Sequence, residues 1–312
     1  MSTTTPPPPV LTTAEDVLPP TSHPDALRRS TAAAGKSLSR PWASIAAVII
    51  AVLWTIPSFG MLVSSFRPER LTKTTGWWTF FSSPTVTLDN YRAVLSTTDS
   101  SGLGAYFINS FVIVIPAVII PVVLAVLAAY TFAWIEFPFR NVLFIAVFAL
   151  QIVPIQVTLI PLLSLYVKGG LTGFPAIWIS HSIFALPLAI FLLHNFMREI
   201  PRELIEAARV DGAGHAKILF SVLLPLLKPA IAAFAIFQFL WVWNDLLVAL
   251  TFAGGPEASP ITVGLANLSG TRDSAWHLLS AGAFVSIIVP VLVFLSLQRY
   301  FVRGLLAGGL KG

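Results

Sequence analysis

Six long runs of apolar residues limit what this chain can fold into. They cover roughly 43–66, 106–133, 142–166, 174–196, 230–253 and 277–301. A helix needs about 17–25 such residues to cross a bilayer, and it satisfies its own backbone polar groups, as lipid requires. The chain is 56% hydrophobic and 11% charged, whereas soluble domains are about 25% charged. The sequence therefore predicts an all-α membrane protein with six transmembrane helices.

The Lys and Arg residues predict the orientation of these helices, because cytoplasmic loops carry an excess of both. If the N-terminus is cytoplasmic, the cytoplasmic segments contain about two thirds of the 19 Lys and Arg residues. We therefore expect both termini, and the connection between spans four and five, to be cytoplasmic. Residues 1–41 are rich in Pro, Thr, Ser and Ala and are expected to form a disordered tail before a membrane domain over 42–312.

The connection between spans four and five is polar, although the runs on both sides are almost wholly apolar. Pro201 suits the first turn of a helix, and the residues of 202–210 are mostly good helix formers. Gly212 offers the left-handed position that ends a helix. A second short helix should then run from about 213 to 224, until Pro225 stops or bends it. The pattern predicts a helix, a sharp turn and a helix.

The first of these helices should carry an apolar stripe and a flat patch. The apolar stripe is expected at Ile200, Leu204 and Ala208, which recur at helical spacing. Ala207 and Ala208 leave a nearly flat patch that another backbone can approach. Glu206 and Asp211 flank this patch with negative charge.

This insert resembles a known signature. Glu206-Ala207-Ala208, three residues, Gly212, nine residues and then Val222-Leu223-Leu224-Pro225 is similar to the EAA motif of ABC-transporter permeases. The family usually has Ile where this chain has Val222. The resemblance implies that the insert is a cytoplasmic coupling helix that fits a cleft on an ATPase. The residues implied in ATPase coupling are Glu206, Ala207, Ala208, Asp211, Gly212, Leu224 and Pro225.

Other stretches resemble one branch of that family, the binding-protein-dependent carbohydrate importers. Ser65-Phe66-Arg67-Pro68-Glu69, Gly76-Trp77-Trp78 and Thr87-Leu88-Asp89-Asn90-Tyr91 look most like alpha-glucoside systems. The segment that carries them either meets a solute-binding protein or lies at the membrane interface, where tryptophans are common. Residues 298–312 resemble the C-terminus of MalG-like subunits, which implies a non-helical tail that contacts the ATPase. Its expected contact residues are Gly304, Gly308, Gly309 and Lys311.

Four polar residues within the apolar runs are candidates for the solute path. Gln151 and Gln156 lie in the third run, and Asn244 and Asp245 lie in the outer half of the fifth. Amides inside a span usually face the bundle interior, where they contact a solute or bond two helices together. A carboxylate inside a span marks a functional position unless it is paired or hydrated. The sequence leaves both interpretations open.

Several classes of function are disfavoured. The chain has no cysteine, and its five histidines are scattered, so we expect no metal site. The segment 30–37, STAAAGKS, lacks the first glycine of a phosphate-binding loop, so we expect no cofactor here. Basic residues follow membrane topology, which argues against nucleic acid.

The resemblance implies a non-enzymatic permease in a bacterial plasma (inner) membrane. Its expected partners are a second, MalF-like permease, two MalK-like ATPase subunits that bind ATP and Mg, an extracytoplasmic solute-binding protein and membrane lipid. The alternatives are an ion-coupled secondary transporter, a glycerol-phosphate or polyol ABC permease, and a membrane scaffold.

Overall fold

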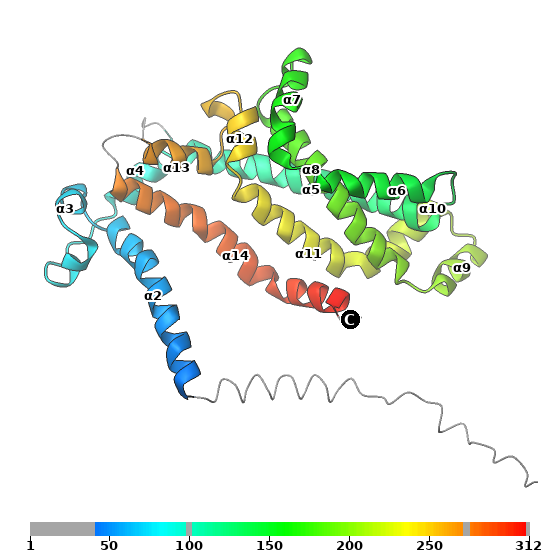
Figure 1. Cartoon of the computed structure of the whole chain (residues 1–312), viewed down its shortest axis with the longest axis horizontal. Coiled ribbons are helices and arrows are strands. Elements are labelled where there is room, and N and C mark those ends of the chain that lie inside the picture. The colour runs from blue at the N-terminus through cyan, green and yellow to red at the C-terminus, as the bar shows by residue number, and fades with distance from the viewer. Residues whose placement is uncertain (1–40, 98–101, 271–274, 310–312) are drawn as a thin grey trace, which may run out of the picture. The chain divides into compact units, whose positions relative to one another are not determined.

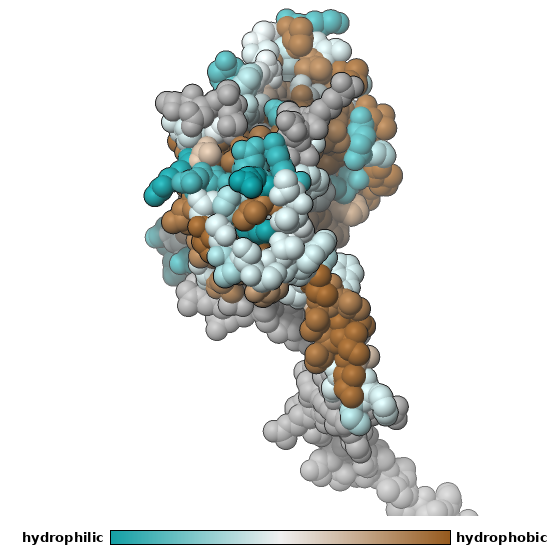
Figure 2. Space-filling view, turned by 90° about the vertical axis from the view of Figure 1, so that its left-hand side faces the viewer, coloured by the Kyte–Doolittle hydropathy of each residue, from teal (hydrophilic) through white to brown (hydrophobic). Residues whose placement is uncertain are grey.

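The computed structural model describes residues 41–97, 102–270 and 275–309, with side chains up to residue 297. The chain divides into two units, residues 1–59 and 60–312. In the first unit the described part is helical and belongs to α2 (Pro41–Ser65). Its surface is hydrophobic over almost the whole helix (Figure 2). The range predicted for the first span, 43–66, is confirmed as a helix.

The described residues of the second unit form helices joined by turns and short connections (Figure 1). Short helices follow α2 and lead into the long helix α5 (Gly104–Trp134). The other elements, in chain order, are α3 (Glu69–Thr74), η2 (Trp77–Phe81), α4 (Asp89–Leu95), α6 (Arg140–Ala149), η3 (Leu150–Ile152), α7 (Ile155–Lys168), α8 (Phe174–Arg198), α9 (Arg202–Val210), α10 (His215–Lys217), η4 (Ile218–Leu223), α11 (Leu224–Trp243), α12 (Leu247–Phe252), η5 (Pro256–Ala258), α13 (Ile261–Ser269) and α14 (Trp276–Gly309).

Five helices in the described part of the chain are long and apolar enough to cross a membrane, or six if one bent pair counts as a span. The predicted second, fourth and sixth spans correspond to α5, α8 and the first part of α14. The bundle packs α5 along α8, and α11 against both α5 and α14. Small buried residues on the two facing helices, such as Ala125, Ala129 and Ala189, allow their backbones to approach closely.

The third predicted span, 142–166, is sharply bent in the structure. Helices α6 and α7 meet at 102°. The reason lies at Val153, which is extended (φ −74°, ψ 120°), because the ring of Pro154 excludes the residue before it from the helical region. Figure 1 shows α7 turned away from the line of α6.

The fifth span also differs from the prediction. Helix α11 ends at Trp243, and α12 starts at Leu247 as a separate element. At this end the backbone N–H of Asn244 makes the last helical bond, to the carbonyl of Leu240 at 3.2 Å, and its side-chain amide donates to the same carbonyl at 2.8 Å. Asn244 and Asp245 therefore lie in a break between two helices, not in a continuous span.

Of the two outcomes predicted for Pro225, a stop or a bend in the second helix of the insert, the structure excludes the stop. An apolar helix runs without interruption from His215 to Trp243. The residues before Pro225, Ile218–Leu223, form a π-helix. Its wider turn shifts the hydrogen bonding ahead of the proline, which has no N–H to donate. Pro225 then sits in the first turn of α11, where that loss is tolerated.

The glycines near the C-terminus are helical, so the prediction of a non-helical tail is wrong for them. Helix α14 includes Gly304 and Gly308 and ends at Gly309. Glycine weakens a helix by about 1 kcal/mol relative to alanine but does not prevent one. Lys311 lies outside the described residues, as do residues 1–40.

Candidate functional site

The polar insert after α8 is a short helix closed by a tight turn. Pro201 precedes α9 with an extended backbone (φ −56°, ψ 134°) and starts the helix where its missing N–H costs nothing. At the other end Gly212 has φ +75°. The N–H of Gly212 donates to the carbonyl of Arg209 at 2.9 Å, and the N–H of Ala213 donates to that of Ala208 at 2.9 Å. This pair of bonds is a Schellman motif, which confirms the predicted role of Gly212 in the turn.

The two faces of α9 differ in exposure. Ile205 is only 2% exposed and joins the hydrophobic cluster that contains Met197, Leu219 and Leu223. On the other face Glu206 and Ala207 are exposed, as are Asp211 and Gly212 in the turn. Ala208 is half-buried against the cluster. The predicted patch is therefore largely open, and it rests on a helix that is fixed to the membrane bundle.

Only the middle residue of the apolar stripe predicted on α9 is misplaced. Leu204 is 47% exposed, whereas Ile205 is buried. Ile200 and Ala208 do pack against the cluster. The sequence pattern fitted both positions, and only the direction in which α9 leaves Pro201 decides which side chain faces the bundle.

A hydrogen bond that the sequence did not reveal ties the insert to α5. The hydroxyl of Tyr130 lies 2.7 Å from Nδ1 of His215, the first residue of α10. His215 itself is exposed, as expected for a residue of the insert. Leu224 and Pro225 follow within the same continuous helix. The insert is thus joined to α5 by this bond and to α11 by the unbroken backbone.

The four candidate path residues do not form a single site. Gln151 lies in η3, at the bend between α6 and α7, and is exposed. Gln156 is exposed on α7, and the side chain of Asn244 is bonded to its own helix. Asp245 lies at the break after α11. The structure brings Gln151 close to other polar groups but does not bring these four together.

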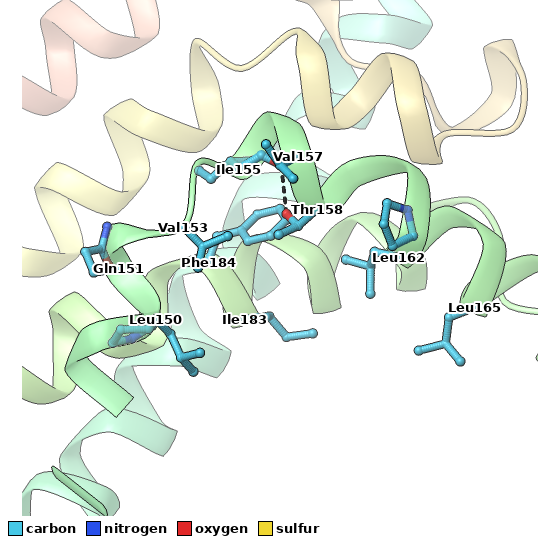
Figure 3. Close-up of a pocket in the computed structure, with 12 residues that line it drawn as sticks. Leu150, Gln151, Val153, Ile155, Val157, Thr158, Leu162, Leu165, Ile183 and Phe184 are labelled. Carbon is cyan, nitrogen blue, oxygen red and sulfur yellow. Dashed lines mark hydrogen bonds between the residues drawn. The ribbon is translucent and has the colours of Figure 1, made fainter. Parts of the chain in front are cut away.

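Gln151 borders two adjoining spaces. The first is an open groove of about 530 Å³ along α7 and α8, lined mainly by apolar side chains including Leu162 and Phe184. Figure 3 shows Gln151 at the break in the ribbon, with the hydroxyl of Thr158 donating to the carbonyl of Ile155. The second is a cavity of about 30 Å³ behind it, also bordered by His181 and Gln238. The two spaces share Gln151, Ile155 and Phe184.

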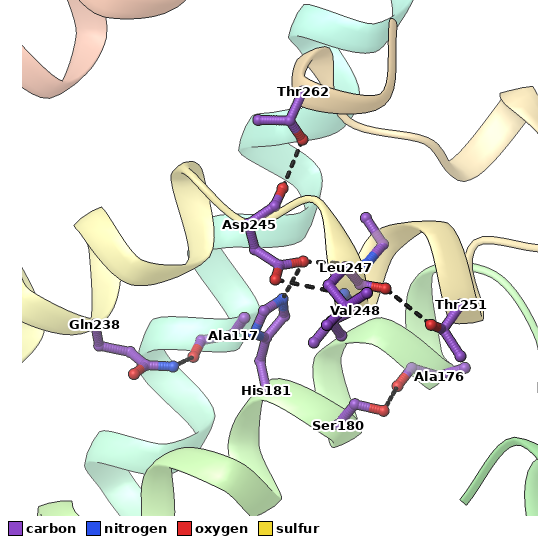
Figure 4. A network of polar contacts seen from close by, with 11 residues as sticks. Ala117, Ala176, Ser180, His181, Gln238, Asp245, Leu247, Val248, Thr251 and Thr262 are labelled. Carbon is purple, nitrogen blue, oxygen red and sulfur yellow. Dashed lines mark hydrogen bonds and ion pairs between the residues drawn. The ribbon is translucent and has the colours of Figure 1, made fainter. Parts of the chain in front are cut away.

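Asp245 is the centre of a polar network with contacts to three helices, α8, α12 and α13 (Figure 4). Its carboxylate accepts from the backbone N–H groups of Val248 and Ala249, at 3.4 and 3.1 Å, and so caps α12. Its backbone carbonyl accepts from the hydroxyl of Thr262 on α13, at 2.6 Å. Nε2 of His181, on α8, lies 3.8 Å from the carboxylate. The carboxylate is therefore engaged with protein groups.

His181 is a residue that sequence reasoning missed. It is 2% exposed and lies within the apolar helix α8. A search for closely spaced histidines passes over it, because its partner Asp245 is far away in sequence. The available signal was its position, since an ionisable residue inside an apolar run usually has a polar partner.

The capping role of Asp245 gives a testable difference between two variants. Asp245→Ala should lower the stability of the full chain by about 0.5–2 kcal/mol, because two N–H groups at the start of α12 lose their acceptor. Asp245→Asn should retain most of that stability, because asparagine caps equally well. Thermal unfolding of the purified chain in lipid nanodiscs measures both. Equal stability of the two variants would show that the cap is not what Asp245 contributes.

Comparison with known proteins shows which family the chain matches. Residues 121–306 match the family described as "Binding-protein-dependent transport system inner membrane component". The Synechocystis protein "Osmoprotective compounds uptake permease protein GgtD" is 53% identical over 273 residues, which are 86% of this chain and 91% of that protein. "Alpha-glucoside transport system permease protein AglG" of Rhizobium meliloti is 49% identical over 254 residues, 78% of this chain and 66% of that protein.

The fold is similar to that of a solved transporter. One chain in the crystal structure of a bacterial ABC transporter involved in the import of the acidic polysaccharide alginate has a TM-score of 0.68 at 22% identity. The similarity covers 84% of this chain and 97% of that one.

These findings first define the class of the protein, which is a multi-pass, non-catalytic permease subunit of the inner membrane. The chain belongs to the family of binding-protein-dependent ABC-transporter permeases, in its carbohydrate-importer group. The predicted family is therefore confirmed.

Proposed function

We propose that this chain forms half of the translocation path of an ATP-driven importer and receives the movement of a separate ATPase through α9 and the Gly212 turn. The observation that carries this proposal is the two-faced insert. Ile205 fixes α9 to the bundle while Glu206 and Ala207 stay exposed on the other side. An exposed flat patch on a firmly held short helix suits a rigid connection to a moving partner.

The proposal includes topology and partners. The distribution of Lys and Arg supports cytoplasmic termini and a cytoplasmic insert. A second permease, two ATPase subunits that bind ATP and Mg, and a solute-binding protein complete the transporter. Glu206 and Asp211 would meet basic residues of the ATPase. The C-terminal end of the chain is proposed to make a second contact with the ATPase, through Gly304, Gly308, Gly309 and Lys311. The three glycines lie on helix α14. Residues 1–41 are proposed to be a tail outside the membrane domain.

The solute is proposed to be a neutral, hydroxyl-rich molecule such as an alpha-glucoside. The groove beside Gln151 is lined by uncharged residues, which suits a sugar better than glycerol phosphate. Its neighbour Gln151 offers both a donor and an acceptor for hydroxyl groups. Gln156, Asn244 and Asp245 remain candidates for later steps of the path. An osmoprotective compound is the second candidate, because the 53% identical Synechocystis protein is named for such uptake.

Purification and uptake test the proposal together. The full chain should co-purify with an ATPase and a second permease from its native membrane in a mild detergent. The complex in proteoliposomes, with its binding protein, should take up maltose or trehalose only when ATP is supplied. Uptake that continues without ATP and stops when the ion gradient is removed would overturn it in favour of ion-coupled transport. ATP-driven uptake of an osmoprotectant, but of neither sugar, would move the second candidate to first place.

A further inference from the structure

The segment after α2 contains an uncharged, strongly apolar stretch between two charged helices. No Asp, Glu, Lys or Arg occurs from Gly76 to Leu88. The large apolar side chains exposed there are Trp78 (64%), Phe81 (69%), Val86 (63%) and Leu88 (54%). The helices on either side carry ion pairs, Lys73–Glu69 on α3 and Arg92–Asp89 on α4. Such a concentration of exposed apolar side chains marks a surface that contacts a membrane or another protein.

A buried arginine holds this stretch in its shape. The guanidinium of Arg67 donates to the carbonyl of Gly76 at 2.8 Å and to the hydroxyls of Thr75 and Thr79, each at 2.9 Å. Arg67 is only 2% exposed, and Asn90 donates to its carbonyl at 2.8 Å. Charge-assisted bonds of this kind are about twice as strong as neutral ones. The exposed aromatic side chains are therefore presented by a fixed backbone.

The position of Trp77 shows how deep this stretch lies relative to α2. A Cβ atom added to Gly60 would come within 2.7 Å of Nε1 of Trp77, so the indole ring packs directly on the backbone of α2. Gly60 comes five residues before Ser65, the last residue of α2. At 1.5 Å per residue this contact is about 7–8 Å inside the end of the helix. The 3₁₀ helix η2 thus folds back against the last part of α2, at Gly60, instead of extending away from it.

We infer that Gly76–Leu88 is a membrane-interface segment, with Trp78 and Phe81 inserted at the boundary between phospholipid headgroups and acyl chains. Tryptophan favours this depth, and a short apolar element with charged neighbours binds in the plane of the interface. A soluble binding protein would have to reach the surface of η2, which lies inside the last residue of α2 and not beyond it. The inference depends on α2 crossing the membrane and not on the identity of the solute.

The lack of cysteine in the chain allows a direct test. Single Phe81→Cys and Thr74→Cys variants of the full chain are labelled with the fluorophore NBD and reconstituted into phosphatidylcholine nanodiscs. Thr74 is the control, because it is exposed on the charged helix α3. Lipids that carry a nitroxide spin label at the headgroup should quench the label at position 81 several-fold more than the label at position 74. Equal, weak quenching would overturn the inference. A label at position 81 that is shielded only after a solute-binding protein is added would assign the surface to that protein.

A second variant tests whether the aromatic side chains themselves set the depth. A label at Ser82→Cys should be quenched in the otherwise unchanged chain. It should lose most of this quenching when Trp78→Ser and Phe81→Ser are added. Elution of the variant chain at the same volume in size-exclusion chromatography shows that it is folded. Unchanged quenching in the folded double variant would overturn the role assigned to Trp78 and Phe81.

Discussion

Replacing Gly212 with valine is expected to abolish most solute uptake while the chain still inserts in the membrane. Gly212 has φ +75°, a conformation that β-branched residues strongly disfavour. Strain of this kind costs about 1–3 kcal/mol, which corresponds to about a 5- to 150-fold change in an equilibrium between two shapes. The Schellman turn would open, and Glu206 and Ala207 would leave the position at which the proposed ATPase contact forms.

Asparagine at the same position is the matched control, since it tolerates the left-handed conformation better than other side chains. A Cβ atom at Gly212 meets no other atom within 4 Å, so neither variant is opposed by crowding. ATP-dependent uptake and ATP hydrolysis should be measured on complexes of equal yield. We expect Gly212→Asn to retain much of its uptake and Gly212→Val to hydrolyse ATP without transport. Equal uptake by the two variants would mean that the conformation of this turn does not matter for coupling.

The sequence predicted the parts of this fold that local chemistry controls. Helix α9 and its end at Gly212 follow from a starting proline, good helix formers and one glycine, and all three signals lie within a few residues of the turn. Four of the six span predictions correspond to long helices for the same reason, because hydropathy over about 20 residues is a local property. The family resemblance required only the spacing of the motif.

The exact positions at which spans three and five break were harder to predict than the spans themselves. Several spans contain prolines, and α5 remains one helix through Pro116 and Pro121. Pro154 breaks its span because Val153 becomes extended, and whether the preceding residue does so depends on what surrounds it. Helix α11 ends at Trp243, and the Asn244 amide bonds back to Leu240. Such outcomes are decided by tertiary packing, which hydropathy does not contain.

The candidate path shows a similar limit. Asp245 was singled out because a carboxylate inside an apolar run needs a reason. In the structure the carboxylate of Asp245 caps α12 and lies near His181. His181 comes from a part of the chain that is far from Asp245 in sequence. Gln151 and Gln238 border one cavity although they come from different helices. Side chains that meet only after folding cannot be paired from a single sequence.

Replacing Ile205 with alanine is expected to release α9 from the membrane bundle. Truncating a buried isoleucine costs about 2–5 kcal/mol, and a helix of nine residues has too few internal bonds to stay helical by itself. The insert should then move independently of α8 and of the helix that starts at His215. Hydrogen exchange over residues 201–214 of the full chain in nanodiscs should become much faster, and ATP-dependent uptake should fall with it.

Leu204→Ala is the control, because it removes a similar side chain from the adjacent, 47% exposed position. Exposed substitutions usually change stability by no more than about 0.5 kcal/mol, so exchange over the insert should stay near that of the unchanged chain. If Leu204→Ala accelerated exchange as much as Ile205→Ala, the orientation of α9 would have to be turned to the stripe that the sequence suggested. If only Ile205→Ala did so and uptake was unaffected, α9 would be docked on the bundle without carrying movement from the ATPase. The proposal that α9 passes the movement of the ATPase to the bundle is supported only if Ile205→Ala loses both its protection from hydrogen exchange and its solute uptake.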